Sequence, residues 1–510
     1  MRQKTIHLEN YQVEKVINYK VNTLLFWVTL LLISFSTSGF SQEHEEGKYV
    51  KETDPLVLKK IEEWQGLKFG LLMHWGPYSQ WGIVESWSIC PEEYGWCKRE
   101  KGKNPDNYYA YVKEYEQLKN TFNPVKFDPE KWAEAAKYAG MKYMVFTTKH
   151  HDGFSMFDSK YTDYKITDKG SPFSSNPKAN ITKEIFNAFR GQGLWAGAYF
   201  SKPDWHHPDY WDPYFPPRDR NVNYEPEANP EKWERFKNFT HNQILELLTD
   251  YGKVDILWLD GGWVAKESKT DITSWYDKQL KNAKNGYLKR RKVNQDIQMD
   301  ALVAKARKKQ PGLIVVDRAV HGKNQNYLTP ENRIPKEALP YPWESCIIAG
   351  GGWSYAFNAK YMSGRKGIHT LIDIVAKGGN LLLNIAPSPE GTWDEGAYRL
   401  LREIGDWMKI NSEAIYNTNS MAPYKFDQVA ITTKKDGSVY LIYMVQEGQK
   451  ELPSQILFPD YKPASRAKVS LLGSKTRLRW KQTEKGMSIS IPKYLQKRLL
   501  NTEAFVLKIK

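Results

Sequence analysis

The sequence predicts an α/β protein: a (β/α)8-like, TIM-type barrel followed by a C-terminal antiparallel β-sandwich. Two observations predict the barrel. Apolar strand-like runs alternate with amphipathic helical stretches from about residue 55 to residue 415, and each run ends in polar or aromatic side chains. The sandwich is predicted by a third observation, because from about residue 420 short strand-like segments alternate with turns.

The first 41 residues resemble a secretory signal peptide. The segment from Asn22 to Phe40 is apolar, follows Lys15 and Lys20, and ends in small residues close to Ser41. An uncleaved N-terminal membrane anchor is the alternative, although the apolar core is short for a membrane span. We therefore expect a secreted or periplasmic protein, with no stable membrane insertion after the signal is removed.

The barrel is expected in residues 42 to 418. A doubly wound parallel sheet would also alternate strands and helices, but it usually has a glycine-rich phosphate loop after its first strand, and none follows Met73. In a barrel, the carboxyl ends of all strands lie on one face, where catalytic groups gather. One helix is predicted at Pro129 to Ala139. The predicted buried strands are Phe69 to Met73, Tyr143 to Thr148, Leu194 to Phe200, Val254 to Leu259 and Leu313 to Val316.

Residues 419 to 510 are expected to form the β-sandwich. No group of catalytic side chains gathers in this part of the sequence, so a structural or accessory role is expected for it. Its predicted strands are Val429 to Thr433, Ser438 to Met444, Lys468 to Leu472 and Ala504 to Ile509.

The chain is basic, which limits the classes of partner. Its net charge is +15 over 510 residues, and +13 remains without the first 41 residues. Such a field attracts acidic partners, among them sulfated or uronic-acid polysaccharides. No zinc-finger spacing, RNP-like motif or long Lys/Arg tract occurs, so nucleic acid is not an expected partner.

No metal or other cofactor is expected. His150 and His151 are adjacent, and adjacent residues point to opposite sides if the strand continues through them. We therefore interpret them as neutral imidazoles that bind substrate hydroxyls, and a satisfied structural pair is the alternative. Cys90 and Cys97 could form a disulfide in an oxidising compartment, but their spacing is not that of a metal site.

Asp260 is the most informative candidate for catalysis. It ends the apolar run VDILWLD and is followed by two glycines, which allow a substrate to approach the backbone closely. A nucleophilic carboxylate needs such a partly dry setting. The alternative is an Asp that caps the next element.

Hydrolysis of a glycosidic bond would need a second carboxyl group that protonates the leaving oxygen. Glu331, Glu337 and Glu344 follow the Asp317–Arg318 strand end and are the candidates. Glu331 lies where a long loop could reach across the barrel mouth, whereas Glu344, beside Trp343, has the more apolar setting. The residues alone leave these two nearly even.

Several segments together resemble family 29 of the glycoside hydrolases, the α-L-fucosidases, over roughly residues 55 to 415. The resemblance implies a (β/α)-type barrel followed by a β-sandwich, and an exo-acting enzyme that removes terminal α-L-fucose with retention of configuration. The segments are FGLLMHWGPYSQW, KYMVFTTKHHDGFSMFDS, GAYFSKPDW, VDILWLDGGW, VVDR and LIDIVAKGGNLLLNIAPSPEGTW.

The resemblance also implies roles for individual residues. Asp260 matches the family nucleophile, and the usual place of the acid/base residue puts Glu331 ahead of Glu344. Tyr199 matches the first place of a strand-end aromatic pair, although Phe200 occupies the second. The predicted substrate-binding residues are His74, Trp75, His150, His151, Tyr199, Trp258, Arg318 and Trp343.

Three points stay open at this stage. The segment IVESWSICPEEYGWC departs from the shorter loop that the family leads us to expect, and it offers Glu85 and Glu93 as further substrate contacts. The same fold could act on a related sugar such as α-L-galactose, or be an inactive glycan-binding homologue. The natural glycan is undecided, with sulfated fucan as one possibility raised by the basic charge.

Overall fold

The structure is a computed structural model that describes residues 49–283, 286, 288 and 290–510. These residues fall within one unit of the chain, residues 46–510. The predicted signal peptide lies outside the described residues. None of the described helices combines the length and the apolar character needed to cross a membrane.

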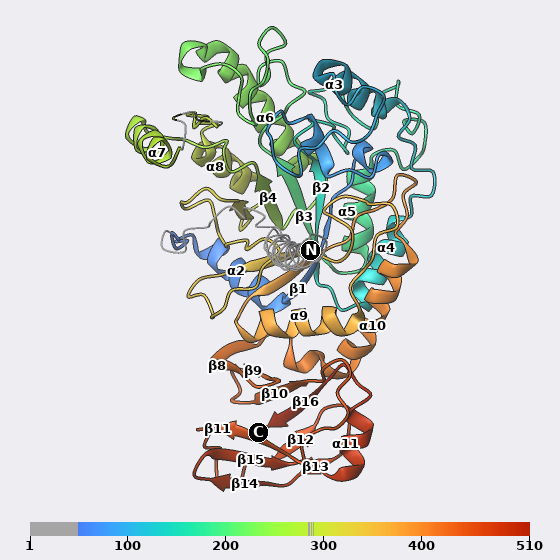
Figure 1. Cartoon of the computed structure of the whole chain (residues 1–510), viewed down its shortest axis with the longest axis vertical. Coiled ribbons are helices and arrows are strands. Elements are labelled where there is room, and N and C mark those ends of the chain that lie inside the picture. Colours follow the sequence, from blue (N-terminus) through green and yellow to red (C-terminus); the bar gives the residue numbers. More distant parts are fainter. Residues whose placement is uncertain (1–48, 284–285, 287, 289) are drawn as a thin grey trace, which may run out of the picture. The chain divides into compact units, whose positions relative to one another are not determined.

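A curled, parallel sheet of seven strands forms a TIM-like half-barrel, which confirms the predicted α/β class (Figure 1). The five strands predicted in this part all form, and their ends move by no more than two residues. The sequence pattern does not predict the other two, which are short and begin with polar residues. In spatial order the strands are β5 (Ile314–Asp317), β4 (Ile256–Asp260), β3 (Trp195–Ser201), β2 (Tyr143–Lys149), β1 (Phe69–Met73), β7 (Asn380–Asn384) and β6 (Glu344–Ile348).

Irregular chain takes the place of an eighth strand between β5 and β6. Isolated bridges join Val316 of β5 to Gln325, in antiparallel fashion, and Glu331 to Cys346 of β6, in parallel fashion. The Cys346 amide donates to the carbonyl of Pro330, and the Asn332 amide donates to the carbonyl of Cys346. This pairing holds Glu331 beside the middle of β6.

Helices follow most of the strands, as expected of a (β/α) pattern (Figure 1). The predicted helix at Pro129 to Ala139 forms as α4 (Pro129–Tyr138), whose first turn is capped by the Asp128 side chain. The other helices are α2 (Pro55–Leu67), α3 (Tyr108–Glu116), α5 (Ile181–Gly191), α6 (Pro230–Asp250), α7 (Lys269–Asn282), α8 (Met299–Lys309), α9 (Gly364–Ala376), α10 (Glu395–Asn411) and α11 (Lys493–Leu499). Short 3-10 turns lie at Pro77–Gln80, Glu85–Ile89, Gln117–Asn120, Pro226–Ala228 and Ser412–Ala414.

Side chains alternate in direction along the strands and so contribute to two separate apolar cores. Leu71 and Met73 of β1 pack in a large core with residues of α4, α5, α9 and α10, whereas Leu72 belongs to a smaller cluster with Tyr143, Tyr199 and other inward-facing strand residues. Successive residues of a strand point to opposite faces, so the small cluster is the filling of the curled sheet. Side chains at the carboxyl ends of the strands therefore lie directly on this packed interior.

Two antiparallel sheets form the C-terminal part, in agreement with the prediction. They share one apolar core, to which Ile431 and Leu441 of the first sheet and Ile456 and Ile489 of the second contribute. The first sheet has the order β13 (Arg477–Leu478), β12 (Val469–Leu471), β16 (Ala504–Ile509), β10 (Val439–Met444), β9 (Val429–Thr433) and β8 (Asn419–Phe426). The second has the order β11 (Gln455–Pro459), β15 (Gly486–Ser490) and β14 (Trp480–Thr483).

Candidate active site

The candidate active site lies at the carboxyl ends of strands β1 to β5. Asp260 is the last residue of β4, and Arg318 directly follows β5. Tyr199 of β3 points into the same place, and Glu331 reaches it from the irregular segment after β5. Parallel strands end at one edge of their sheet, which is why residues so far apart in sequence meet here.

Asp260 is held by two donors. The Tyr199 hydroxyl donates to Oδ2 at 2.7 Å, and an Arg318 nitrogen donates to Oδ1 at 3.2 Å. Burial opposes ionisation of the carboxyl, but the Arg318 charge and the Tyr199 hydrogen bond outweigh it and hold the Asp260 pKa well below its usual range. Gly261 has φ +86°, and a Cβ there would lie 2.3 Å from the ring of Pro203. The glycine therefore permits the turn that presents an ionised Asp260.

Arg318 bridges Asp260 and Glu331. One guanidinium nitrogen donates to Asp260, and the other terminal nitrogen donates to Oε2 of Glu331. Burial lowers the pKa of Arg318, but the two carboxylates raise it well above its ordinary value, so the guanidinium stays charged. Trp353 Nε1 donates to the second Glu331 oxygen at 3.2 Å, and the Glu331 side chain is 31% exposed. Glu331 thus combines a fixed position with access to solvent.

Three histidines face these acids. His74 Nδ1 lies 2.9 Å from Asn384 Oδ1, and His150 Nδ1 lies 2.5 Å from the Ser86 hydroxyl. Burial lowers the pKa of His74 to about 4 and the pKa of His151 to about 3, and it places that of His150 well below its ordinary value. All three imidazoles are therefore neutral at neutral pH and can both donate and accept hydrogen bonds.

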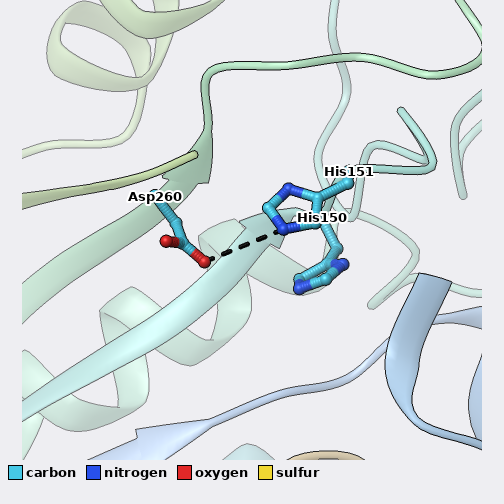
Figure 2. Close-up of side chains that lie close together, drawn as sticks. All are labelled: His150, His151 and Asp260. Atoms are coloured by element: carbon cyan, nitrogen blue, oxygen red, sulfur yellow. Dashed lines mark ion pairs between the residues drawn. The ribbon is translucent and has the colours of Figure 1, made fainter. Parts of the chain in front are cut away.

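His150 and His151 both lie at the site, although adjacent strand residues would point to opposite faces. Strand β2 ends at Lys149, and the chain turns at His150, so the two rings lie 4.2 Å apart. Figure 2 shows the His151 ring turned toward Asp260, with Nε2 at 3.9 Å from Oδ2. Neither His151 ring nitrogen has a hydrogen-bond partner among the described residues, so both can serve a ligand.

The same three side chains are the group in the described part of the chain that could hold a metal ion. Ligand atoms of His150, His151 and Asp260 lie within 4.8 Å of one another. The charged Arg318 on Asp260 and the Ser86 contact of His150 compete with such a role. The expectation of no metal cofactor stays a prediction.

Trp258 forms the floor beneath the acids. Its ring stacks on Tyr199, with centroids 5.2 Å apart, and the Arg318 guanidinium lies 5.2 Å from the Trp258 ring. The side chain is almost completely buried within the filling of the half-barrel. The site therefore has an apolar aromatic base under its charged groups.

Three of the predicted site residues lie elsewhere. Trp75 faces the helices, where it packs on Trp132 and donates to the carbonyl of Ser388. Trp343 packs in the same large core as Trp75. Glu344 is the first residue of β6, so it lies at the amino end of its strand, fully buried, and accepts a hydrogen bond from Tyr143. The third acid/base candidate, Glu337, is exposed on the surface.

The loop after β1 adds groups that the sequence left undecided. Glu85 is 1% exposed, adopts φ +32°, and faces Glu331 and Asp260 closely enough that these charges, together with burial, raise its pKa well above the usual range. Trp87 of the same turn packs its ring 5.1 Å from that of His151. Glu93 is exposed. In the sequence, only the position of Glu85 in a loop after a site strand indicates that it could contact substrate. Glu93 lies in the same loop, so this position does not distinguish the two residues.

The comparison with protein families agrees with this geometry. The alpha-L-fucosidase model matches residues 37–413, and the model of the alpha-L-fucosidase C-terminal domain matches residues 426–510. Human plasma alpha-L-fucosidase is 27% identical over 476 residues, which cover 88% of this chain and 90% of that protein. Rat plasma alpha-L-fucosidase is 28% identical over 369 residues, or 69% and 70% of the two chains.

Solved structures show the same fold. Alpha-L-fucosidase isoenzyme 1 from Paenibacillus thiaminolyticus aligns with a TM-score of 0.67 at 26% identity and covers 89% of this chain and 99% of its own. The Thermotoga maritima alpha-fucosidase in complex with fucose aligns with a TM-score of 0.65 at 24% identity, covering 88% and 96%. With Asp260 at a strand end, Glu331 facing it from the following irregular segment, and a family match over most of its length, the chain belongs to the alpha-L-fucosidases of glycoside hydrolase family 29.

Proposed function

We propose that this protein is a secreted, exo-acting α-L-fucosidase that cleaves with retention of configuration, with Asp260 as the nucleophile and Glu331 as the acid/base. The bridge through Arg318 supports this assignment above all other observations. It brings both carboxyl groups to one guanidinium, in keeping with the short separation of about 5 Å that a double displacement needs.

In the first step, a carboxylate oxygen of Asp260 attacks the anomeric carbon of fucose while Glu331 gives its proton to the leaving oxygen. The Arg318 charge and the Tyr199 hydroxyl support this role, because they keep Asp260 ionised in a buried site. In the second step, Glu331 takes a proton from water, and this water displaces Asp260. The second inversion at the same carbon restores the original configuration.

Substrate recognition is assigned to the groups around the two acids. The neutral imidazoles of His74, His150 and His151 would bind the sugar hydroxyls, and the Trp258 ring would pack against an apolar side of the sugar. Glu85 Oε1 is buried without a partner among the described residues, which supports a hydrogen bond from Glu85 to substrate.

The location and the glycan class are part of the proposal. The apolar segment after Lys20 supports export, as do relatives whose names place them in plasma. Fucosylated oligo- or polysaccharides are the proposed substrates, and the charge of +13 outside the first 41 residues supports sulfated fucans among them.

Hydrolysis of an aryl α-L-fucoside by residues 42–510 tests the assignment. Asp260→Ala is expected to reduce kcat by roughly four orders of magnitude or more, because the nucleophile is lost. Glu331→Ala is expected to be restored in part by azide, which replaces the water that Glu331 would activate, and to yield the α-configured azide. Glu337→Ala, on the same stretch but exposed, is the matched control and should behave like wild type.

Two outcomes would overturn the proposal. If the first sugar product seen by NMR were β-L-fucose, the mechanism would be inverting and Asp260 would not be a nucleophile. Full activity of Glu331→Ala would assign the acid/base role to another group. An aryl α-L-galactoside, assayed beside the fucoside, decides between the two related sugars.

A further inference from the structure

A cavity of about 860 Å³ lies at the amino ends of the strands, away from the candidate active site. Its wall includes Lys68, just before β1, and Gly378, just before β7. Residues 62–66 of α2, residues 339–342, residues 417–420 at the start of β8 and residues 434–436 after β9 also contribute to the wall. The cavity therefore lies between the half-barrel and the first C-terminal sheet, and the catalytic proposal makes no use of it.

Lys68 is the unusual residue of this wall. It is 2% exposed, and its carbonyl accepts a hydrogen bond from the Leu381 amide, which fixes its backbone beside β7. Its ammonium group has no ion-pair or hydrogen-bond partner among the described residues. Burial lowers the pKa of Lys68 to about 8, so much of it is still charged at neutral pH.

The protein pairs its other buried lysines. Lys149 binds Asp204 at 2.9 Å, and Lys202 binds Asp317. Within the cavity wall, Lys377 is paired with Asp373, and Lys435 with Glu62. An unpaired buried ammonium is costly, so Lys68 is a group that a ligand anion would stabilise.

The rest of the wall is mixed, and it carries the acids Glu62, Glu63 and Asp436 and the lysines Lys377, Lys434 and Lys435 beside neutral polar groups. Asn417, Thr418, Asn419 and Ser420 offer amides and hydroxyls, and Tyr341, whose ring stacks on that of Tyr49, lines the same cavity. Such groups bind sugar hydroxyls and the apolar face of a sugar ring. The volume is within the range that ligand sites use and leaves room for more than one sugar unit.

We propose that this cavity is a non-catalytic binding site for an acidic sugar unit, whose sulfate or carboxylate group pairs with Lys68. The basic field of the chain would draw such a glycan to the surface. The inference stands apart from the fucosidase proposal, because it uses no residue of the candidate active site.

Calorimetric titration of the protein with three tetrasaccharides that carry no fucose tests the site. Sulfated chondroitin tetrasaccharide offers sulfate and carboxylate, the unsulfated form offers carboxylate alone, and chitotetraose is neutral. We expect binding of at least one charged tetrasaccharide and binding of chitotetraose that is weaker by about tenfold or more. Comparison of the two charged probes identifies which anion pairs with Lys68.

Variants then locate the binding. Lys68→Met is expected to weaken binding of the charged probe about tenfold or more, while Lys183→Met, which removes the same charge from the exposed face of α5, leaves it unchanged. Asn419→Asp, at an exposed position of the wall, should also weaken it through like-charge repulsion, and it serves if Lys68→Met does not fold. Turnover of aryl α-L-fucoside should be unchanged in both cavity variants.

The proposal fails if none of the probes binds, if chitotetraose binds as tightly as the charged probes, or if folded Lys68→Met binds like wild type. An equal loss in Lys183→Met would mean that the general field of the protein attracts the probe, and it would also overturn the assignment to this cavity. Loss of fucosidase activity in Asp260→Ala with probe binding intact would separate this site from the catalytic one.

Discussion

Two carboxyl groups, Asp260 partly accessible and Glu344 fully buried, occupy opposite ends of the same half-barrel, and their protonation differs. Asp260, at the carboxyl end of β4, lies against the charged Arg318, and its pKa is held well below the usual range despite burial. Glu344, at the amino end of β6, has Tyr143, Tyr327 and Trp258 beside it and no cation among the residues that the structure describes, and burial raises its pKa to about 7. Burial acts in the same direction on both groups, so the neighbouring charge decides the outcome.

The difference separates a catalytic position from a structural one. An ionised, partly accessible carboxylate can act as a nucleophile, whereas a fully buried and largely protonated one mainly completes the interior. Trp258 joins the two places, because its ring stacks on Tyr199 at the site while the same side chain lies beside Glu344.

Removal of the cation is expected to have the largest effect. Arg318→Met would take the charge from Asp260 and Glu331 together and reduce kcat/KM by on the order of 10²- to 10³-fold, as losses of preorganised charge do. The Asp260 pKa would then rise, since the largest influence opposing burial is lost and the Tyr199 hydrogen bond remains, and the acidic limb of the kcat/KM profile would move to higher pH. A pH–rate series on wild type and variant measures the shift.

Arg318→Lys is the matched variant for this prediction. It keeps one charge but cannot span two carboxylates, so we expect an intermediate activity and an acidic limb close to that of wild type. An unchanged acidic limb in Arg318→Met would show that Arg318 does not control ionisation of Asp260, and the comparison of the two carboxyls would lose its physical basis.

At the opposite end of the half-barrel, Glu344→Gln should change how the free energy of unfolding depends on pH. It should not move the acidic limb of the kcat/KM profile. The folded protein keeps the Glu344 proton up to about pH 7, whereas the unfolded chain releases it near the ordinary glutamate pKa of 4.5. The protonated carboxyl therefore contributes fully to the free energy of unfolding below about pH 4.5. This contribution, on the order of 3 kcal/mol, is lost as the pH rises to about 7. The amide does not titrate, so the variant should lack this loss.

Urea unfolding followed by tryptophan fluorescence at pH 5 and pH 8 checks this expectation. The free energy of unfolding of wild type should fall relative to that of Glu344→Gln between the two pH values. Asp260→Asn is the control at the other end of the half-barrel. The free energy of unfolding of wild type should not fall relative to that of Asp260→Asn between pH 5 and pH 8, since the lowered Asp260 pKa leaves this carboxyl ionised throughout that range. Parallel curves for wild type and Glu344→Gln would contradict a raised Glu344 pKa.

The same contrast explains what the sequence could and could not predict. Long apolar runs predict β1 to β5 and hence Asp260 and Arg318 at strand ends. Glu331 and Glu344 could not be separated by composition, because the choice depends on the pairing that sets Glu331 beside Cys346 and on Glu344 being the first residue of β6. β6 itself is only five residues long and begins Glu344–Ser345, so it has no clear strand pattern.

The family resemblance predicts Trp75 in the site, whereas strand geometry argues against it. It directly follows His74, and neighbours in extended chain point to opposite faces, so only one of the two could enter the pocket.

Glu85 is the converse case, a residue that faces the site although the sequence could not assign it there. Its φ of +32° and its position in a short 3-10 turn depend on tertiary packing, which no local pattern in the sequence encodes.

The smallest expected effects come from the two tyrosines that donate to these carboxyls. Tyr199 donates to Asp260 and Tyr143 donates to Glu344, and both rings lie in the filling of the half-barrel. Tyr199→Phe should lower kcat/KM by about tenfold, because one hydrogen bond to the nucleophile, worth on the order of 1 to 2 kcal/mol, is lost. Tyr143→Phe should lower the free energy of unfolding by a similar amount with kcat/KM nearly unchanged.

Steady-state kinetics and urea unfolding on both variants test this expectation. If Tyr143→Phe lost activity as strongly as Tyr199→Phe, Glu344 and Asp260 would be coupled through Trp258 rather than independent.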